Sequence, residues 1–458
     1  MSFKSLSQKN VIVVGLGISG ISVSRKLIKS KVKLFGWDDN YKTREKAKIL
    51  GIKVKKIEDI DFKRVDFLVL SPGIPHLPPN QHISAKLAIE SRCPIITDIE
   101  LLSFLDEKKF TIGITGTNGK STTTSYIQYI LNKLNIKSQA CGNIGTPVTD
   151  INFSDDQKLI IEASSFQLER IHEFRFDISV LLNITNDHLD RHLSFENYIN
   201  AKLKIFNRQT DNDNAIISVD DLNCSKICDN FKNKYKSKLI RISTKKFIKN
   251  GISLIVEKGF IKIFDDIHHC ELMIDLKDLS FFQSNHNYQN LLAAYAICKC
   301  LKINNRDISK GIIGFNGLEH RLEKISKFKN ITFYNDSKAT NACSAKIALS
   351  CLENIYWLTG GRSKKGGLHG IGGKELKNVR KIFTYGEASL EFKKHLVDMK
   401  STEAFLSLDD ALKSAFMNAM KEKININITL SPACSSFDQF NNFEERGNYF
   451  KKIVKNIT

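Results

Sequence analysis

Short apolar runs that end in glycine or polar residues recur along most of this chain. Examples are NVIVV (10–14), FTIGIT (110–115) and NIYWLTGG (354–361), and helical patterns such as TTTSYIQYILNKL (122–134) follow many of them. Apolar runs without strict alternation are typical of strands that are buried on both faces of a parallel sheet. The repeated strand–loop–helix order therefore predicts the α/β fold class.

The first segment predicts a Rossmann-like unit over residues 1–97. Its first strand leads into the glycine turn Gly15-x-Gly17-x-x-Gly20, and a helical pattern follows. Such glycines permit a tight turn and the close approach of a phosphate to the helix N-terminus. A second strand ends in Asp38 and Asp39, where a ribose-binding acid would lie. By itself this pattern indicates an NAD enzyme, another nucleotide-binding protein or only a tight turn.

The second segment, 98–317, contains a phosphate loop in the strand–loop–helix order that such loops require. The loop is GTNGKS (116–121), but the glycine that the Walker pattern places five residues before Gly119 is replaced by Ile114. Backbone N–H groups and the helix dipole attract phosphates, and Lys120 adds a positive charge. Ser121 or Thr122 is positioned in the sequence to ligate Mg²⁺.

Two later strands of the same segment end in polar residues. KLIIEASSFQLE (158–169) contains Glu162, and DISVLLNITNDHLDRH (177–192) contains His188. Ligands of open α/β sheets bind at the carboxyl ends of the strands. Glu162 and His188 are therefore predicted to converge on metal and phosphate beside the loop. Residues 215–280 alternate short strands with Lys/Asn-rich turns and are interpreted as peripheral.

The third segment, 318–458, repeats the strand–loop alternation and predicts a second doubly wound, Rossmann-like unit. Its strands are expected in ITFYND (331–336), NIYWLTGG, KIFTYG (381–386) and NITLSPA (427–433). The whole chain is thus expected to form three domains: a Rossmann-like domain, a P-loop ATPase-like α/β domain and a second Rossmann-like domain.

Composition agrees with a multidomain globular protein. Of its 458 residues, 42% are hydrophobic and 26% are charged. A chain of this length is too long for a single hydrophobic core. No apolar run approaches the roughly 20 residues that span a bilayer, and the N-terminus leads almost directly into a strand, so a cytoplasmic protein is expected. The formal charge is +20, but the lysines are spread along the chain. We interpret them as a solvated surface and expect neither nucleic acid nor membrane as a partner.

Several loops, in this order along essentially the whole chain, resemble the Mur ligases. They are ITGTNGKST, EASSFQLE, NDHLDRH, HNYQN, HR, NDSKATN and LSPACSSFDQFNNFEERG. The short glycine loop is similar to the phosphate loop of that family, and the C-terminal stretch most resembles the members that add D-glutamate. The resemblance implies that ATP phosphorylates UDP-N-acetylmuramoyl-L-alanine to an acyl phosphate, which D-glutamate attacks, in peptidoglycan precursor synthesis. It also implies Mg²⁺ at two sites, a carbamylated lysine, and a UDP-sugar rather than NAD in the first domain.

The resemblance assigns roles to individual residues. Those implied for ATP are Gly116, Thr117, Asn118, Gly119, Lys120, Ser121, Thr122, Asn287, Asn290, Arg321 and Asp336. Those implied for the UDP-substrate are Ser19, Asp38, Gly73 and Asn143. Those implied for D-glutamate are Thr340, Lys364, Ser436, Phe437 and Phe443. The implied metal ligands are Ser121, Glu162, His188 and carbamylated Lys202, and the implied catalytic residues are Lys120, His188 and Lys202.

Some assignments keep an alternative. Lys204 is the second candidate for the carbamate, and Lys364 is preferred to Lys365 by its spacing from Gly361. Asn40 stands where the resemblance leads us to expect an arginine in uracil recognition. At the level of the whole protein the alternatives are a ligase for another amino acid, an NAD-dependent oxidoreductase and a nucleic-acid binder. A monomer is expected.

Overall fold

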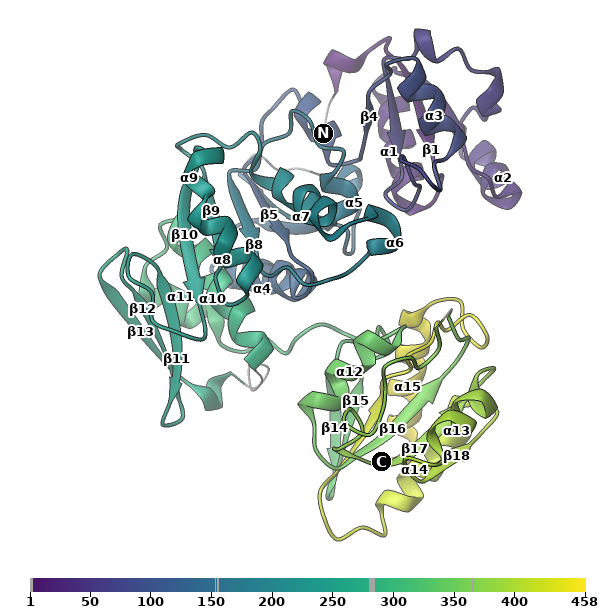
Figure 1. Ribbon diagram of the computed structural model, residues 1–458, viewed down its shortest axis with the longest axis vertical. Coiled ribbons are helices and arrows are strands. Elements are labelled where there is room, and N and C mark those ends of the chain that lie inside the picture. The colour runs from purple at the N-terminus through teal and green to yellow at the C-terminus, as the bar shows by residue number, and fades with distance from the viewer. Residues whose placement is uncertain (1–2, 153, 155, 280–284, 365) are drawn as a thin grey trace. The chain divides into compact units, whose positions relative to one another are not determined.

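A computed structural model describes residues 3–152, 154, 156–279, 285–364 and 366–458. Within these residues the strands form three sheets, and the chain divides into two compact units, Met1–Phe315 and Asn316–Thr458. The first unit contains two of the sheets, and the second contains the third (Figure 1). No helix in the described part of the chain is long and apolar enough to cross a membrane.

The first sheet is parallel, with the strand order β2-β1-β3-β4. Its strands are β1 (Asn10–Val14), β2 (Lys33–Trp37), β3 (Phe67–Leu70) and β4 (Ile95–Ile96), with helices α1 (Ile18–Lys29), α2 (Tyr41–Ile49) and α3 (Ile83–Glu90). Val11 and Val13 pack into one apolar cluster and Ile12 and Val14 into another. Alternate residues of β1 thus bury opposite faces of the sheet, which is why the strand is apolar throughout.

The second sheet has the strand order β13-β12-β11-β10-β9-β8-β5-β7-β6. It is parallel from β6 to β11, and β12 and β13 are antiparallel at its edge. The strands are β5 (Thr111–Thr115), β6 (Ser138–Gly142), β7 (Lys158–Glu162), β8 (Ile178–Leu181), β9 (Asn214–Ser218), β10 (Lys238–Ser243), β11 (Ile252–Glu257), β12 (Phe260–Asp265) and β13 (Cys270–Asp275). Strands β9 to β13, from the segment that the sequence led us to consider peripheral, therefore continue the central sheet out to its edge.

Helices cover this second sheet. They are α4 (Lys120–Lys133), α5 (Ser165–Leu168), α6 (Leu189–His192), α7 (Phe195–Leu203), α8 (Leu222–Asp229), α9 (Phe231–Lys234), α10 (Asn285–Cys300) and α11 (Asn305–Ile312). Residues 291–298 of α10 are buried all round, because small apolar residues allow it to pack between α4 and the sheet. The core therefore holds the start of α4, where the phosphate loop ends, in a fixed position.

The third sheet has the strand order β14-β15-β19-β16-β17-β18, in which only β14 runs antiparallel to its neighbour among the described strands. The strands are β14 (Glu323–Phe328), β15 (Ile331–Asn335), β16 (Ile355–Gly360), β17 (Val379–Tyr385), β18 (Thr402–Ala404) and β19 (Ile426–Leu430). The helices are α12 (Ala342–Cys351), α13 (Ser389–Leu396), α14 (Leu408–Ala419) and α15 (Phe443–Ile457). Two apolar clusters cover its two faces.

The α/β class predicted from the sequence is confirmed. The division between the compact units, after Phe315, lies two residues before the predicted boundary at 317/318. The other predicted boundary, at 97/98, falls inside the first unit, between β4 and β5, which belong to different sheets. The exact domain limits stay predictions.

Candidate active site

The phosphate loop connects β5 to α4. Thr115 ends the strand and Lys120 begins the helix, with Gly119 at φ +84° as the residue before it. A Cβ atom at Gly119 would lie 2.5 Å from Oδ1 of Asn290, so both conformation and space require glycine there. The turn points the first N–H groups of α4 out of the helix end, which is an arrangement that binds anions.

Asn183, just beyond β8, braces the loop. Its Oδ1 accepts the N–H of Asn118 at 2.8 Å, and its Nδ2 donates to the Asn118 carbonyl at 3.2 Å and to Oε1 of Gln289 at 2.8 Å. The hydroxyl of Thr117 lies 3.0 Å from that of Tyr198. The sequence analysis missed Asn183 and Tyr198. A polar residue at the carboxyl end of a buried strand was the available signal for Asn183.

Lys120 and Lys202 converge on this loop. Their Nζ atoms donate to the carbonyl oxygen of Gly116 at 2.9 and 2.8 Å. Lys202 is only 1% exposed, and its ammonium lies 4.8 Å from the centre of the Tyr198 ring. Burial lowers the pKa of Lys202 well below its usual range, and the charge of Lys120 lowers it further. Lys204 instead donates to the carbonyl of Glu169 at 2.6 Å.

Glu162 ends β7, beside the strand that carries the loop. Its partner in register is Ile114 of β5. The carboxylate is buried: Oε1 accepts from Nδ2 of Asn143 at 2.9 Å, while Oε2 has no hydrogen-bond partner in the described part of the chain. A buried carboxylate oxygen without a donor calls for a cation, and carboxylate oxygen is a preferred ligand of Mg²⁺. This atom therefore fits the predicted magnesium site.

Three further predicted residues, His188, Asn287 and Asn290, belong to the same unit as the phosphate loop. His188 precedes α6 with φ +52°, its imidazole is half-exposed, and its ring lies 4.8 Å from that of Phe166. Asn290 accepts the Thr123 hydroxyl of α4 at 3.1 Å, and its Nδ2 donates to Oδ1 of Asn287 at 3.4 Å. Of the predicted adenine-side residues, Asn290 therefore contacts the helix that follows the phosphate loop, and Asn287 contacts Asn290.

The glycine turn of the first sheet is closed by Asp38 and Ser71. The N–H of Leu16 donates to Oδ2 of Asp38 at 2.8 Å, and the Ser71 hydroxyl donates to the Gly15 carbonyl at 2.7 Å. Ser19 is half-buried in the first turn of α1, and Gly73 is exposed in the turn after β3. These predicted substrate residues thus line two neighbouring turns, because β1 pairs with β3.

Arg44 reaches the end of β2 from α2. Its Nη1 donates to the carbonyls of Asp38 and Asp39 at 2.7 and 3.0 Å, and its guanidinium lies 4.5 Å from the centre of the Trp37 ring. Arg44 therefore binds the backbone of the turn that contains Asn40.

In the second unit, Asp336 follows β15. Its carboxyl accepts the N–H of Leu322 at 3.1 Å and the hydroxyl of Ser431 at 2.7 Å. Burial raises the pKa of Asp336 to about 7, although these hydrogen bonds and the charge of Arg321 oppose the shift. The predicted ribose-side and γ-phosphate residues are therefore electrostatic neighbours.

The predicted D-glutamate residues lie on loops at one end of the third sheet. Nζ of Lys364 donates to Oγ1 of Thr340 at 3.3 Å, Ser436 is buried, and Phe437 is exposed. Phe443 begins α15, and its carbonyl accepts the Ser337 hydroxyl at 2.8 Å. The alternative residue Lys365 lies outside the described residues.

The sequence analysis also missed Arg446, which connects two of these loops. It is fully buried, and its guanidinium donates to the hydroxyl and the carbonyl of Ser337 at 2.9 and 2.8 Å and to the carbonyl of Cys434 at 3.1 Å. The loops that carry Thr340 and Ser436 are therefore held by one side chain.

The sequences of known proteins identify the family of this site. Residues 114–298 match the model of the Mur ligase middle domain. Over 98% of both chains, the protein is 38% identical to the UDP-N-acetylmuramoylalanine–D-glutamate ligase of Rickettsia prowazekii. The chain belongs to the Mur ligase family. The UDP-N-acetylmuramoylalanine–D-glutamate ligase of Wolbachia pipientis wMel is 36% identical, over 100% of this chain and 98% of its own.

Solved structures agree on the Mur ligase fold. The UDP-N-acetylmuramate-alanine ligase of Thermotoga maritima is 17% identical and superimposes with a TM-score of 0.59, covering 98% of this chain and 100% of its own. The MurF protein of Acinetobacter baumannii is 15% identical, with a TM-score of 0.56 and coverage of 86% and 85%. The resemblance found in the sequence is confirmed at the level of family and fold.

Proposed function

We propose that this protein is an ATP-dependent ligase that joins D-glutamate to UDP-N-acetylmuramoyl-L-alanine in peptidoglycan precursor synthesis. The observation that carries the proposal is the 38% identity, over 98% of both chains, to a UDP-N-acetylmuramoylalanine–D-glutamate ligase. That alignment spans the phosphate loop and the C-terminal loops alike. The similarity therefore covers the nucleotide site and the predicted amino-acid site together.

The reaction must overcome the low reactivity of a carboxylate. Transfer of the γ-phosphoryl group of ATP to a carboxylate oxygen releases ADP and gives an acyl phosphate. The amine of D-glutamate then attacks the carbonyl carbon, loses a proton, and expels inorganic phosphate, which leaves an amide. Both reactants are anions, so neutralising and orienting them supplies most of the catalysis. We propose that the N-terminus of α4 and Lys120 hold the phosphates, and the position of Lys120 at the start of that helix supports this.

ATP and Mg²⁺ are the cofactors of this family. When bound, Mg²⁺ would supply positive charge that neutralises phosphate oxygens. We propose Ser121 and Glu162 as ligands of a first ion, and the unpartnered Oε2 of Glu162 supports this assignment. His188 and a carbamate on Lys202 are proposed for a second ion.

The surroundings of Lys202 support its carbamylation. Only a neutral amine attacks CO₂, and burial together with the charge of Lys120 favours that state. Attack of Nζ on the carbon of CO₂ with loss of a proton forms the carbamate. The product is an anion, so the repulsion between two ammonium groups at Gly116 becomes attraction.

The remaining contacts follow the family resemblance. For ATP we propose Gly116, Thr117, Asn118, Gly119, Thr122, Asn287 and Asn290, with Arg321 at the γ-phosphate and Asp336 at the ribose. For the UDP-substrate we propose Ser19, Asp38, Gly73 and Asn143, and for D-glutamate Thr340, Lys364, Ser436, Phe437 and Phe443. We further propose a cytoplasmic monomer, since ATP is a cytoplasmic substrate. A molar mass near 52.0 kDa by light scattering would support the monomer.

The decisive experiment measures phosphate release with UDP-N-acetylmuramoyl-L-alanine against a panel of D- and L-amino acids. ADP and phosphate should form only when D-glutamate is present. Turnover with another amino acid would indicate a different Mur-type ligase. Binding of reduced nicotinamide, without any amino-acid-dependent ADP formation, would support the oxidoreductase instead.

A further inference from the structure

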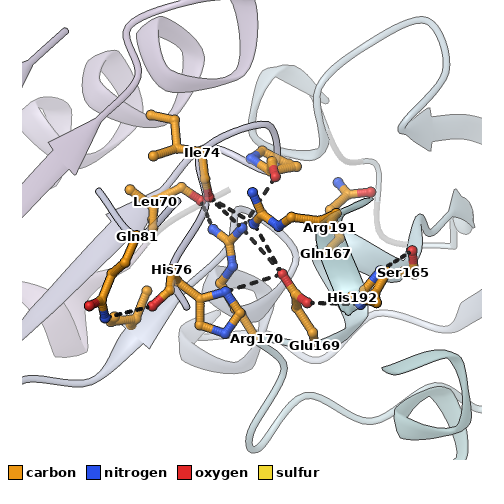
Figure 2. Close-up of polar contacts among 12 residues, drawn as sticks. Leu70, Ile74, His76, Gln81, Ser165, Gln167, Glu169, Arg170, Arg191 and His192 are labelled. Carbon is orange, nitrogen blue, oxygen red and sulfur yellow. Dashed lines mark hydrogen bonds and ion pairs between the residues drawn. The ribbon is translucent and has the colours of Figure 1, made fainter. Parts of the chain in front are cut away.

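Glu169, immediately after α5, is surrounded by cationic and imidazole groups (Figure 2). Its Oε1 lies 3.3 Å from Nδ1 of His76, 3.5 Å from Nη2 of Arg170 and 3.3 Å from Nη2 of Arg191, and its Oε2 lies 3.5 Å from Nδ1 of His192. The side chain is 11% exposed. One carboxylate thus serves as the common partner of four side chains from three segments of the chain.

Two of these partners hold the turn that follows β3. Arg170 donates to the carbonyls of Leu70, Ser71, Pro72 and Ile74 at 2.8, 3.3, 3.2 and 3.1 Å. Arg191 adds a hydrogen bond to the Ile74 carbonyl at 2.8 Å (Figure 2). The turn carries Gly73 and contains two prolines, Pro72 and Pro75, which have no N–H group to fix it through the backbone. The two guanidinium groups therefore add side-chain hydrogen bonds to the few backbone bonds of the turn, such as that from the N–H of Ile74 to the carbonyl of Ser71.

Two of the partners, Arg191 and His192, come from the segment that follows His188. Arg191 and His192 belong to α6, and Nε2 of His192 lies 3.0 Å from the Ser165 hydroxyl of α5. Since α6 begins directly after His188, any displacement of this short helix displaces His188 as well. Glu169 therefore connects the turn after β3 to the segment that carries His188.

Glu169 supplies the negative charge that the guanidinium groups of Arg170 and Arg191 share. Burial lowers the pKa of Arg170 to about 10, with Glu169 opposing the shift, so the guanidinium is still charged at neutral pH. Although burial opposes it, the hydrogen bond and charge of His76 and the charges of both arginines lower the pKa of Glu169 to about 2. Without the anion, the two guanidinium groups would lose the one carboxylate that they share.

We propose that Glu169 is a positioning residue for the UDP-sugar: it holds the Gly73 turn and the His188 segment in one fixed arrangement. The inference rests on the proposed function, since it takes the UDP-sugar as the ligand of that turn. It adds a residue that touches no substrate atom and acts through Arg170 and Arg191.

The test is Glu169→Gln, which keeps the shape of the side chain and removes its charge. KM for UDP-N-acetylmuramoyl-L-alanine and its Kd by calorimetry should rise about tenfold to hundredfold, the usual effect of losing a charged contact. KM values for ATP and D-glutamate should change less than about twofold. Amide hydrogen exchange should accelerate in residues 71–76 and 189–193 and stay unchanged in β5 and α4. Glu169→Asp keeps the charge and should give an intermediate KM.

The matched control is Glu173→Gln. Glu173 pairs with Arg208 at the surface, where both side chains are more than half exposed, so its loss should leave every KM and the exchange pattern unchanged. If Glu169→Gln does not fold, Arg191→Lys is the second variant. Lysine keeps the positive charge but cannot contact both the Ile74 carbonyl and Glu169, so this variant should also raise the KM for the UDP-substrate.

Each outcome separates the inference from the proposed function. A wild-type protein without D-glutamate-dependent ADP formation would refute both. An active wild-type protein with an unchanged UDP-substrate KM in the variant would refute the positioning role alone. An equal rise in all three KM values, with faster exchange throughout the unit, would show that Glu169 only stabilises the fold.

Discussion

The ammonium groups of Lys120 and Lys202 share one acceptor, the carbonyl oxygen of Gly116, at 2.9 and 2.8 Å. Like charges at this separation in a buried place repel, and the weaker hydration of Lys202 makes it the one that gives up its proton. Lys120 at the start of α4 and Lys202 of α7 thus meet at one carbonyl of the phosphate loop, and burial drives Lys202 toward the neutral, nucleophilic form.

Lys202→Arg should abolish most activity. Arginine keeps a positive charge but stays protonated and does not form the carbamate, so the ligand of the proposed second ion is lost. We expect turnover to fall at least about a hundredfold, as when a group that stabilises transition-state charge is removed. In ¹³C NMR with labelled bicarbonate, the wild-type protein should show a carbamate signal that the variant lacks. Lys204→Arg is the control, and near-normal turnover by Lys202→Arg would refute the assignment.

Lys120→Ala should stop turnover while leaving the UDP-substrate bound. Lys120 begins α4, which follows strand β5 of the second sheet, whereas the glycine turn proposed for the UDP-sugar follows β1 of the first sheet. Calorimetry should therefore give a nearly unchanged Kd for UDP-N-acetylmuramoyl-L-alanine and much weaker binding of ATP. Lys133→Ala, at the other end of α4, should keep both affinities. Loss of UDP-substrate binding in Lys120→Ala would contradict this division of roles.

Asp336 should make the stability of the second unit depend on pH. Burial raises the pKa of its carboxyl from 3.8 to about 7, so the folded protein holds a proton that the unfolded chain has already lost between those values. The stability that this carboxyl contributes is fully present below the unfolded pKa of 3.8, and it is lost as the pH rises through the folded pKa of about 7. Asp336→Asn removes this loss, and its Tm relative to the wild type should increase between about pH 5 and pH 8. A constant difference in Tm would show that Asp336 is ionised throughout.

Local patterns identified the strands and loops, and the resemblance supplied the residue roles. The strand–loop–helix order around Lys120 was predictable because it depends on neighbours in the sequence. The bracing of the loop by Asn183, and the contacts of Glu169 and Arg446, were not, because each joins segments that meet only in the folded chain. The interpretation of residues 215–280 as peripheral did not foresee that β9 to β13 extend the central sheet out to its edge, because a strand's own sequence does not say which sheet it extends.

The loops of the third sheet should select D-glutamate. Lys364 offers a cation beside Thr340. Ser436 is buried, and Arg446 holds its loop by a hydrogen bond to the carbonyl of Cys434. Two fixed sites for the two carboxylates leave the amine of one enantiomer in reach of the acyl phosphate. Each lost contact should cost about 1.5–3 kcal/mol, a tenfold to hundredfold change in affinity.

Lys364→Ala and Ser436→Ala should therefore raise KM for D-glutamate by that factor and leave KM for ATP and for the UDP-substrate nearly unchanged. The control is Lys374→Ala, another exposed lysine of the same unit, which should change none of the three. Steady-state kinetics with each substrate varied in turn measures all of these values. Because a fold defect weakens every substrate together, an equal rise in all three KM values would make these loops structural, and D-glutamate would have to bind elsewhere.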